Sequence, residues 1–161
     1  MVTNPDLDLV LERDVAVERS KIWAGWTQPE LLKQWFTPVP FRTVEAEIDL
    51  RPGGIFRTLF ISPEGDTFPN LGCYLDVVPE TRLVWTNALL PGFRPNGAAP
   101  VSGSDFRFTA IISLADSATG TLFNATVMHE TVASRELHEQ MGFHDGWGIA
   151  LDQLAALISS P

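Results

Sequence analysis

Three histidines, His129, His138 and His144, are the residues of this chain that could bind a metal ion or exchange protons near neutral pH. On one continuous helix His138 and His144 would lie about 240° apart, and therefore on different faces. Cys73 is the only cysteine, which excludes a zinc site built from cysteines. The spacing of these residues predicts no metal site.

A nucleophile for covalent catalysis is the second kind of chemistry to consider. The chain lacks the Gly-x-Ser-x-Gly motif of serine hydrolases. Cys73 alternates with Leu71 and Leu75 along a predicted strand, and a buried thiol on an apolar face usually acts as a small hydrophobic side chain. Ser102 and Ser104 have no histidine near them in the sequence. We therefore assign no catalytic residue.

Polar side chains at otherwise apolar positions are the strongest chemical signal. Such residues either hydrogen-bond one another or lie on the solvated side of the sheet, or they line a pocket and orient a ligand among aromatic walls. On the second interpretation, the candidate ligand-binding residues are Arg57, Trp85, Asn87, His129, Met141, His144 and Trp147.

A histidine in such a pocket could also act as a general acid or base, because its ordinary pKa is about 6.5. His129 and His144 are the candidates for this role. The reaction would need a carboxylate, tyrosine or arginine facing the same pocket, and Glu47, Arg57 and Tyr74 are candidates. Alternation along a strand does not decide which face they share.

Strands and short helices must position these candidates. Alternating apolar residues predict a first strand over 7–17, followed by a helix over 18–26 and a second short helix that Pro38 ends. Thr27 and Glu30 have the spacing of a capping box at the start of this second helix. Turns rich in Gly and Pro then separate six predicted strands, over 42–50, 54–61, 67–78, 82–90, 105–114 and 121–130.

The C-terminal part of the chain predicts one long helix from Ser134 to Ile158. Apolar residues recur there at three- and four-residue spacings and define one face, on which Met141 and His144 both lie. The connection over residues 91–104 is rich in Pro and Gly and has no period of its own, which is typical of a lid or a mobile segment.

Strands that follow one another through short turns form an antiparallel sheet, and an amphipathic helix must cover its apolar face. The sequence therefore predicts an α+β fold with about seven strands, two short helices and a long C-terminal helix. Its 161 residues predict a single domain over 1–161.

Composition excludes several functions. Eleven Lys and Arg against twenty Asp and Glu give a net charge of −9, which argues against binding to a nucleic-acid backbone. No stretch approaches the roughly 18 apolar residues of a transmembrane helix, and the first residues do not resemble a signal peptide. We expect a cytoplasmic protein with neither nucleic acid nor membrane as a partner.

Four parts of the chain carry a family resemblance. They are Trp23-Ala-Gly-Trp-Thr-Gln-Pro-Glu-Leu-Leu-Lys-Gln-Trp35, Asp49-Leu-Arg-Pro-Gly-Gly-Ile-Phe-Arg57, Gly72 with Pro79 and Leu83, and Met141-Gly-Phe-His-Asp-Gly-Trp-Gly-Ile-Ala-Leu-Asp-Gln-Leu154. In these segments, which follow the family's order, the chain resembles the START-like superfamily, also called birch-pollen-allergen-like, helix-grip or SRPBCC. Within it, the resemblance is to the heat-shock-protein-90 ATPase activator homologue group.

This resemblance implies a helix-grip fold, in which a curved sheet and the C-terminal helix enclose an apolar cavity. Relatives bind lipids, polyketides, hormones or other apolar molecules. Our leading hypothesis is a module that binds an apolar or amphipathic small molecule without a cofactor. One alternative is an enzyme similar to a polyketide cyclase or aromatase that uses a cavity histidine. Another is a chaperone ATPase regulator or other partner-binding protein, including a homodimer.

Overall fold

One large antiparallel sheet dominates the computed structural model, which describes residues 2–97 and 106–159. Its strand order is β1-β9-β8-β5-β4-β3-β2. The strands are β1 (Asp8–Val15), β2 (Arg42–Ile48), β3 (Ile55–Ile61), β4 (Thr67–Val78), β5 (Arg82–Thr86), β8 (Phe108–Asp116) and β9 (Thr121–His129). A separate small hairpin pairs β6 (Leu89–Leu90) with β7 (Arg94–Pro95). The predicted α+β class and the sheet of about seven strands are confirmed.

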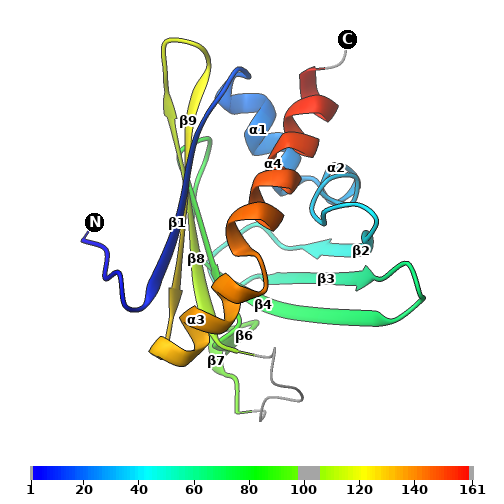
Figure 1. Ribbon diagram of the computed structural model, residues 1–161, viewed down its shortest axis with the longest axis vertical. Coiled ribbons are helices and arrows are strands. Elements are labelled where there is room, and N and C mark those ends of the chain that lie inside the picture. Colours follow the sequence, from blue (N-terminus) through cyan, green and yellow to red (C-terminus); the bar gives the residue numbers. More distant parts are fainter. Residues whose placement is uncertain (1, 98–105, 160–161) are drawn as a thin grey trace.

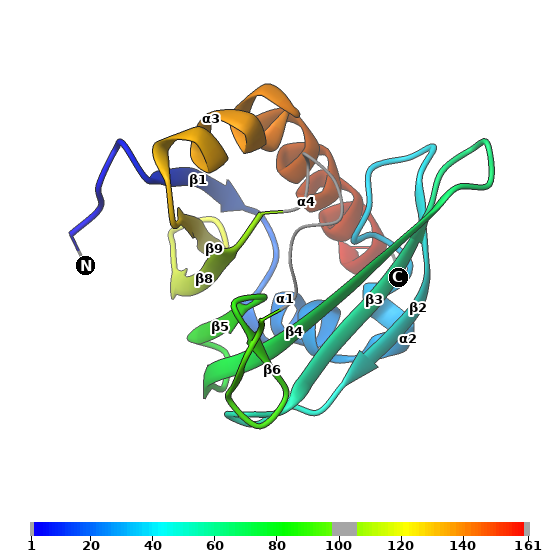
Figure 2. The ribbon, with the colours of Figure 1, turned by 90° about the horizontal axis from the view of Figure 1, so that it is seen from below.

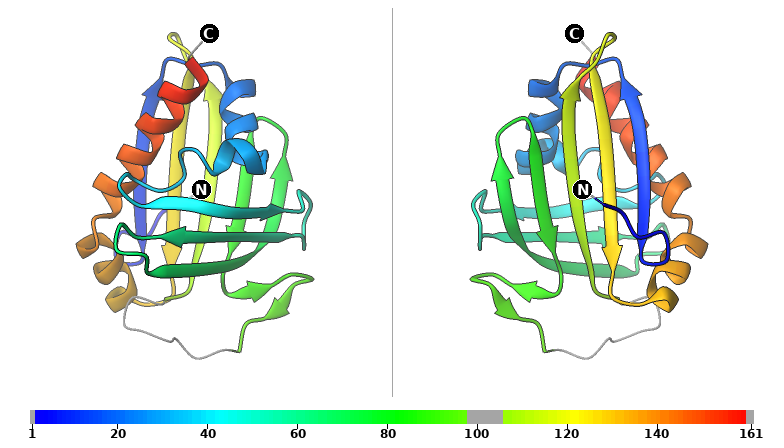
Figure 3. Two further views of the ribbon diagram at one scale, coloured as in Figure 1. Left: turned by 90° about the vertical axis from the view of Figure 1, so that its right-hand side faces the viewer. Right: turned by 90° about the vertical axis from the view of Figure 1, so that its left-hand side faces the viewer.

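The sheet is strongly curved. Its β2-β3-β4 end crosses the direction of β1, β9 and β8 (Figure 3), and irregular pairing at Thr43/Glu45 and at Tyr74/Asp76 interrupts the ladder. Such bulges bend strands and increase their twist. The sheet consequently wraps around the C-terminal helix α4 (Phe143–Ser159), which crosses its concave side (Figures 1 and 2).

Two short helices, α1 (Arg19–Thr27) and α2 (Pro29–Leu32), close one end of this layer. Ile22, Leu32 and Leu154 are fully buried where these helices approach α4. Gly25 permits this approach, because a Cβ atom there would collide with the Leu154 side chain. The core is therefore formed jointly by the concave side of the sheet and these three helices.

The start of α2 differs from the prediction. Thr27 does not form a capping box, because it is the last residue of α1 and its hydroxyl donates to the Trp23 carbonyl at 2.8 Å. The residue that caps α2 is Gln28, and its side chain makes no capping hydrogen bond. The capping-box prediction is wrong because the chain begins the new helix one residue later, with Pro29 at its first position.

The single C-terminal helix predicted over 134–158 is also wrong. The chain forms α3 (Val132–Gln140) and α4, separated at Met141 and Gly142. Gly142 has a φ of +91°, a conformation that glycine adopts without steric cost and that ends helices. Both helices contact β1, which explains why apolar spacing continues across the break.

Two further predictions concern membrane insertion and the 91–104 connection. No helix in the described ranges 2–97 and 106–159 is long and apolar enough to span a membrane. Residues 91–97 include β7. Residues 98–104, among them Ser102 and Ser104, lie outside the described residues.

Candidate functional site

A pocket of about 870 Å³ lies among the concave side of the sheet, α3, α4 and the segment after α2. Twelve aromatic residues line it: Trp26, Trp35, Phe36, Phe41, Phe56, Phe60, Trp85, Phe106, Phe108, Phe123, Phe143 and Trp147. They come from α1, α4, the 33–41 segment, strands β3, β5, β8 and β9, and the residues just before β8. The fold therefore gathers aromatic rings that are distant in sequence around one space.

These rings support one another through direct contacts. Trp85 and Trp147 lie parallel, with ring centroids 6.4 Å apart, so that β5 and α4 provide two stacked walls. Phe56 packs edge-on against Trp85 at 5.1 Å. Rings fixed in this way form a rigid wall that loses little conformational entropy when a ligand binds.

Tyr74 lies behind this wall. Its ring stacks on Phe56 at 5.2 Å and is completely buried. Burial raises the pKa of the Tyr74 hydroxyl far above its ordinary value, and the hydroxyl has no hydrogen-bond partner among the described residues. Tyr74 does not line the pocket, so the structure offers no support for using it as an acid or base there.

Exposed apolar residues mark the mouth of the pocket. Val39, Phe41, Leu71 and Met141 line it, and each has at least 40% of its surface exposed. Val39 and Phe41 belong to the 33–41 segment, and Met141 belongs to the break between α3 and α4. An apolar molecule would meet an apolar rim before reaching the interior.

Gln153 on α4 holds the mouth segment in place. Its Nε2 donates to the carbonyls of Trp35 and Thr37, both at 2.9 Å. Its Oε1 accepts from the backbone N–H of Val39 at 3.0 Å. One amide side chain therefore satisfies three backbone groups of a segment that has no regular structure of its own.

Few polar groups face the pocket, and none of its described lining residues is a carboxylate. Asn87 is occupied by the backbone, because its Nδ2 donates to the Phe106 carbonyl and its Oδ1 accepts from the Phe108 N–H, both at 2.8 Å. Arg107 is the one lysine or arginine among the described lining residues. His138, on α3, is the one histidine among the described lining residues.

His138 forms a pair with His129. His129 Nε2 lies 2.8 Å from His138 Nδ1, and His129 Nδ1 lies 2.9 Å from the carbonyl oxygen of Leu7. Burial, and then the neighbouring His129, lowers the pKa of His138 from its ordinary 6.5 to about 4. Within the described residues, no three His, Cys, Asp or Glu side chains are close enough to hold a metal ion.

Four of the seven candidates from the sequence line the pocket: Trp85, Asn87, Met141 and Trp147. His129 is not among the lining residues and lies behind His138. Arg57 and His144 do not line the pocket. These two predictions fail for different reasons.

The orientation predicted for Arg57 is wrong, because Phe56, Thr58 and Phe60 are the β3 residues that face the pocket. Arg57 lies on the opposite side of the sheet and pairs with Glu45 at 3.6 Å and Glu47 at 3.3 Å. Both faces of β3 carry large apolar residues, so alternation could not indicate which face is inside.

The position predicted for His144 is wrong, because the helix is interrupted two residues before it. His144 is exposed and borders a small surface depression together with Asp8 and Arg135. Phe143 and Trp147 occupy the inward face instead. Gly148 is not a lining residue either. A Cβ atom added to it would lie 2.9 Å from Nη2 of Arg13.

Sequence reasoning missed His138, Phe143 and Gly146 as pocket residues. Phe143, Trp147 and Ala150 follow a four- and three-residue spacing that indicates a helix face. Gly146 lies on the same wall, and a Cβ there would meet only Pro38, at 3.9 Å. A helix begun at Phe143 instead of Ser134 would have identified this face.

Comparisons with known proteins agree with this architecture. The family model described as "Activator of Hsp90 ATPase homolog 1-like protein" matches residues 16–159. The crystal structure of protein NE0264 from Nitrosomonas europaea is 46% identical, covers 98% of this chain and 97% of that one, and has a TM-score of 0.90.

More distant structures share the fold alone. The AHSA1-like protein from Aeromonas hydrophila is 20% identical, with 95% of this chain and 92% of that one covered at a TM-score of 0.71. Protein Ms6760 from Mycobacterium smegmatis is 19% identical, with 97% and 93% covered at a TM-score of 0.77. No curated protein matches the chain.

Proposed function

The chain belongs to the Activator of Hsp90 ATPase homolog 1-like family, and we propose that it binds an apolar or amphipathic small molecule in the aromatic pocket. The observation that carries this proposal is a pocket of about 870 Å³ walled by aromatic side chains from eight parts of the fold. Small-molecule sites usually have volumes of about 300–1,000 Å³ and mostly apolar walls with a few polar groups.

The polar residues that line the pocket support ligand binding over acid–base catalysis. Asn87 is already committed to two backbone groups. His138, with a pKa of about 4, is a weak base at neutral pH, whereas an efficient general base has a pKa near the working pH. A neutral histidine among aromatic rings is suited to orienting a bound molecule.

Filling the pocket tests this proposal. Gly146→Leu adds a branched side chain to the pocket wall, where an added Cβ meets only Pro38, and it removes a glycine from the interior of α4. We expect the variant to fold and to bind the apolar fluorescent probe N-phenyl-1-naphthylamine at least tenfold more weakly than the wild type. The affinity of Gly146→Ala, which adds one methyl group, should lie between those of Gly146→Leu and the wild type.

Ala156→Leu is the matched control, because it adds the same side chain to an exposed position of the same helix. Circular dichroism verifies folding, and the probe titration gives the dissociation constants. Wild-type affinity in folded Gly146→Leu would overturn the proposed site. Native mass spectrometry of the freshly purified wild type, compared with its denatured mass, would identify any molecule carried through purification.

A further inference from the structure

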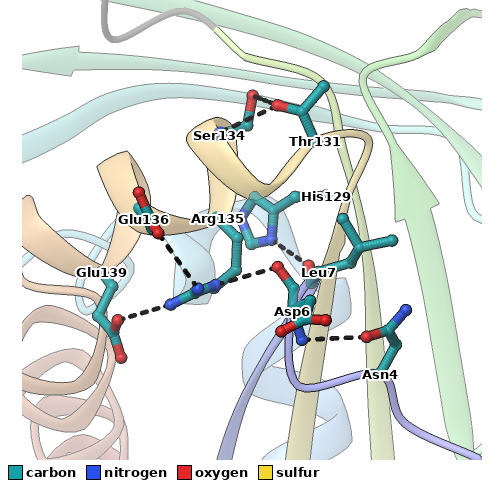
Figure 4. Close-up of polar contacts among 9 residues, drawn as sticks. All are labelled: Asn4, Asp6, Leu7, His129, Thr131, Ser134, Arg135, Glu136 and Glu139. Carbon is teal, nitrogen blue, oxygen red and sulfur yellow. Dashed lines mark hydrogen bonds and ion pairs between the residues drawn. The ribbon is translucent and has the colours of Figure 1, made fainter.

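The protonation pattern of the histidine pair begins at a backbone carbonyl. The oxygen of Leu7 can only accept hydrogen bonds, and it lies 2.9 Å from His129 Nδ1. His129 Nδ1 must therefore carry the proton that it donates to Leu7. Figure 4 shows this contact between the end of β9 and the segment preceding β1.

The protonation of the remaining ring nitrogens follows from that of His129 Nδ1. A neutral imidazole has one N–H and one lone pair, so His129 Nε2 is an acceptor. It lies 2.8 Å from His138 Nδ1, which must then be the donor. His138 Nε2 is left with its lone pair and no proton. The chain of hydrogen bonds therefore assigns the tautomer of both rings.

Both rings are in surroundings that favour the neutral form. Burial lowers the pKa of His129; the Leu7 hydrogen bond and the charge of Asp8 act against this, and the Arg135 guanidinium adds to it. Burial and the neighbouring His129 lower the pKa of His138. Arg135 is itself held by the Asp6 carbonyl at 3.2 Å and by Glu139 at 2.9 Å (Figure 4).

His138 presents its free acceptor in an aromatic environment. The rings of Phe106, Phe143 and Phe108 lie 4.8, 5.2 and 6.0 Å from its own ring, measured between centroids. None of these rings can donate a conventional hydrogen bond. Among the residues that the structure describes, His138 Nε2 has no hydrogen-bond partner. It is not completely buried, so another molecule can reach it. A polar atom of this kind is a natural contact for a ligand.

We propose that the ligand carries an uncharged hydroxyl or N–H group that donates to His138 Nε2, and that His138 selects such molecules over apolar isosteres and ionised acids. This inference rests on the proposed function and specifies the class of ligand. An ionised carboxylate has no proton to donate and would meet a lone pair at this point. A methyl group in the same place would leave the nitrogen unsatisfied.

The first experiment reads the tautomers without any ligand. Two-bond ¹⁵N–¹H correlation spectra of the wild-type protein at pH 7.5 distinguish a protonated ring nitrogen from a bare one. We expect protons on His129 Nδ1 and His138 Nδ1, and bare Nε2 atoms in both rings. A proton on His138 Nε2 would overturn the inference and leave the proposed binding pocket intact.

The second experiment compares 2-naphthol with 2-methylnaphthalene, two probes of similar shape of which only the first is a donor. Displacement of N-phenyl-1-naphthylamine should show that the wild type binds 2-naphthol about five- to tenfold more tightly, the ratio expected for one net hydrogen bond. His138→Asn should remove this preference, because its Nδ2 takes the place of the His138 Nδ1 donor and nothing replaces Nε2.

His138→Gln is the rescue variant, since its amide reaches the position of Nε2 and can offer an acceptor oxygen. It should restore part of the preference for 2-naphthol, although its contact with His129 is lost. Equal binding of both probes by the wild type would overturn this inference alone. Failure of the wild type to bind either probe would overturn the proposed function and this inference with it.

Discussion

Acidification should destabilise this protein between pH 6.5 and about 4, and the histidine pair is the reason. In the folded state the pKa of His138 is about 4, whereas its ordinary value is 6.5. Between these values the unfolded chain binds a proton that the folded chain does not. Stability therefore rises with pH across this window, is fully present above pH 6.5, and is lost as the pH falls towards 4.

The size of the effect follows from the difference between the two pKa values. One pKa unit corresponds to 1.36 kcal/mol, so a difference of about 2.5 corresponds to a loss of about 3 kcal/mol between pH 7.5 and pH 4. The pKa of His129 is also lowered, chiefly by burial, and acts in the same direction. Asp14, whose pKa is held below 3.8 by Ser117 and Thr119, loses its contribution only at lower pH.

Urea unfolding followed by circular dichroism at pH 7.5, 6.5, 5.5 and 4.5 measures the free energy of unfolding across this window. His138→Phe is the matched control, because it keeps an aromatic ring and cannot titrate. We expect the wild type to lose about 2.5 kcal/mol more than His138→Phe between pH 7.5 and pH 4.5. Equal losses in the two proteins would refute the reasoning, since the pH dependence would then come from other groups.

Three further predictions concern the rest of the pocket and its supports. Gln153→Met removes the hydrogen bonds that hold the 33–41 segment; it should lower stability by about 1–3 kcal/mol and accelerate release of N-phenyl-1-naphthylamine, measured by stopped-flow fluorescence. Thr131→Ala removes the cap that accepts from the Ser134 N–H and should cost about 1 kcal/mol in urea unfolding. Cys73 is fully buried, so its reaction with a thiol reagent should proceed no faster than unfolding.

The strands could be predicted from the sequence because they depend on local patterns, namely alternation and turn residues. Alternation and turn residues placed six strands between residues 42 and 130, and β4 (Thr67–Val78) has the predicted bounds. Alternation did not assign the faces of β3, since Ile55 and Leu59 are apolar on one parity and Phe56 and Phe60 on the other. The orientation of Arg57 therefore depended on tertiary packing that no local pattern contains.

The histidine site was inaccessible for a different reason. His138 and His129 meet because the chain turns between β9 and α3, and their protonation depends on Leu7, which is 122 positions away from His129. Treating 134–158 as one helix also gave the inward face to His144 instead of Phe143. Because Gly142 breaks the helix, residues before and after it do not belong to one continuous helical face.

The break at Gly142 also divides the C-terminal region into parts of unequal local stability. α3 has no fully buried residue, whereas α4 buries five, so α3 should exchange its amide hydrogens through smaller openings of the native state. His138 connects the pocket to this less protected helix. A bound ligand would then slow amide exchange in α3 most of all, and transient fraying of that helix would be a second route of release besides the 33–41 segment.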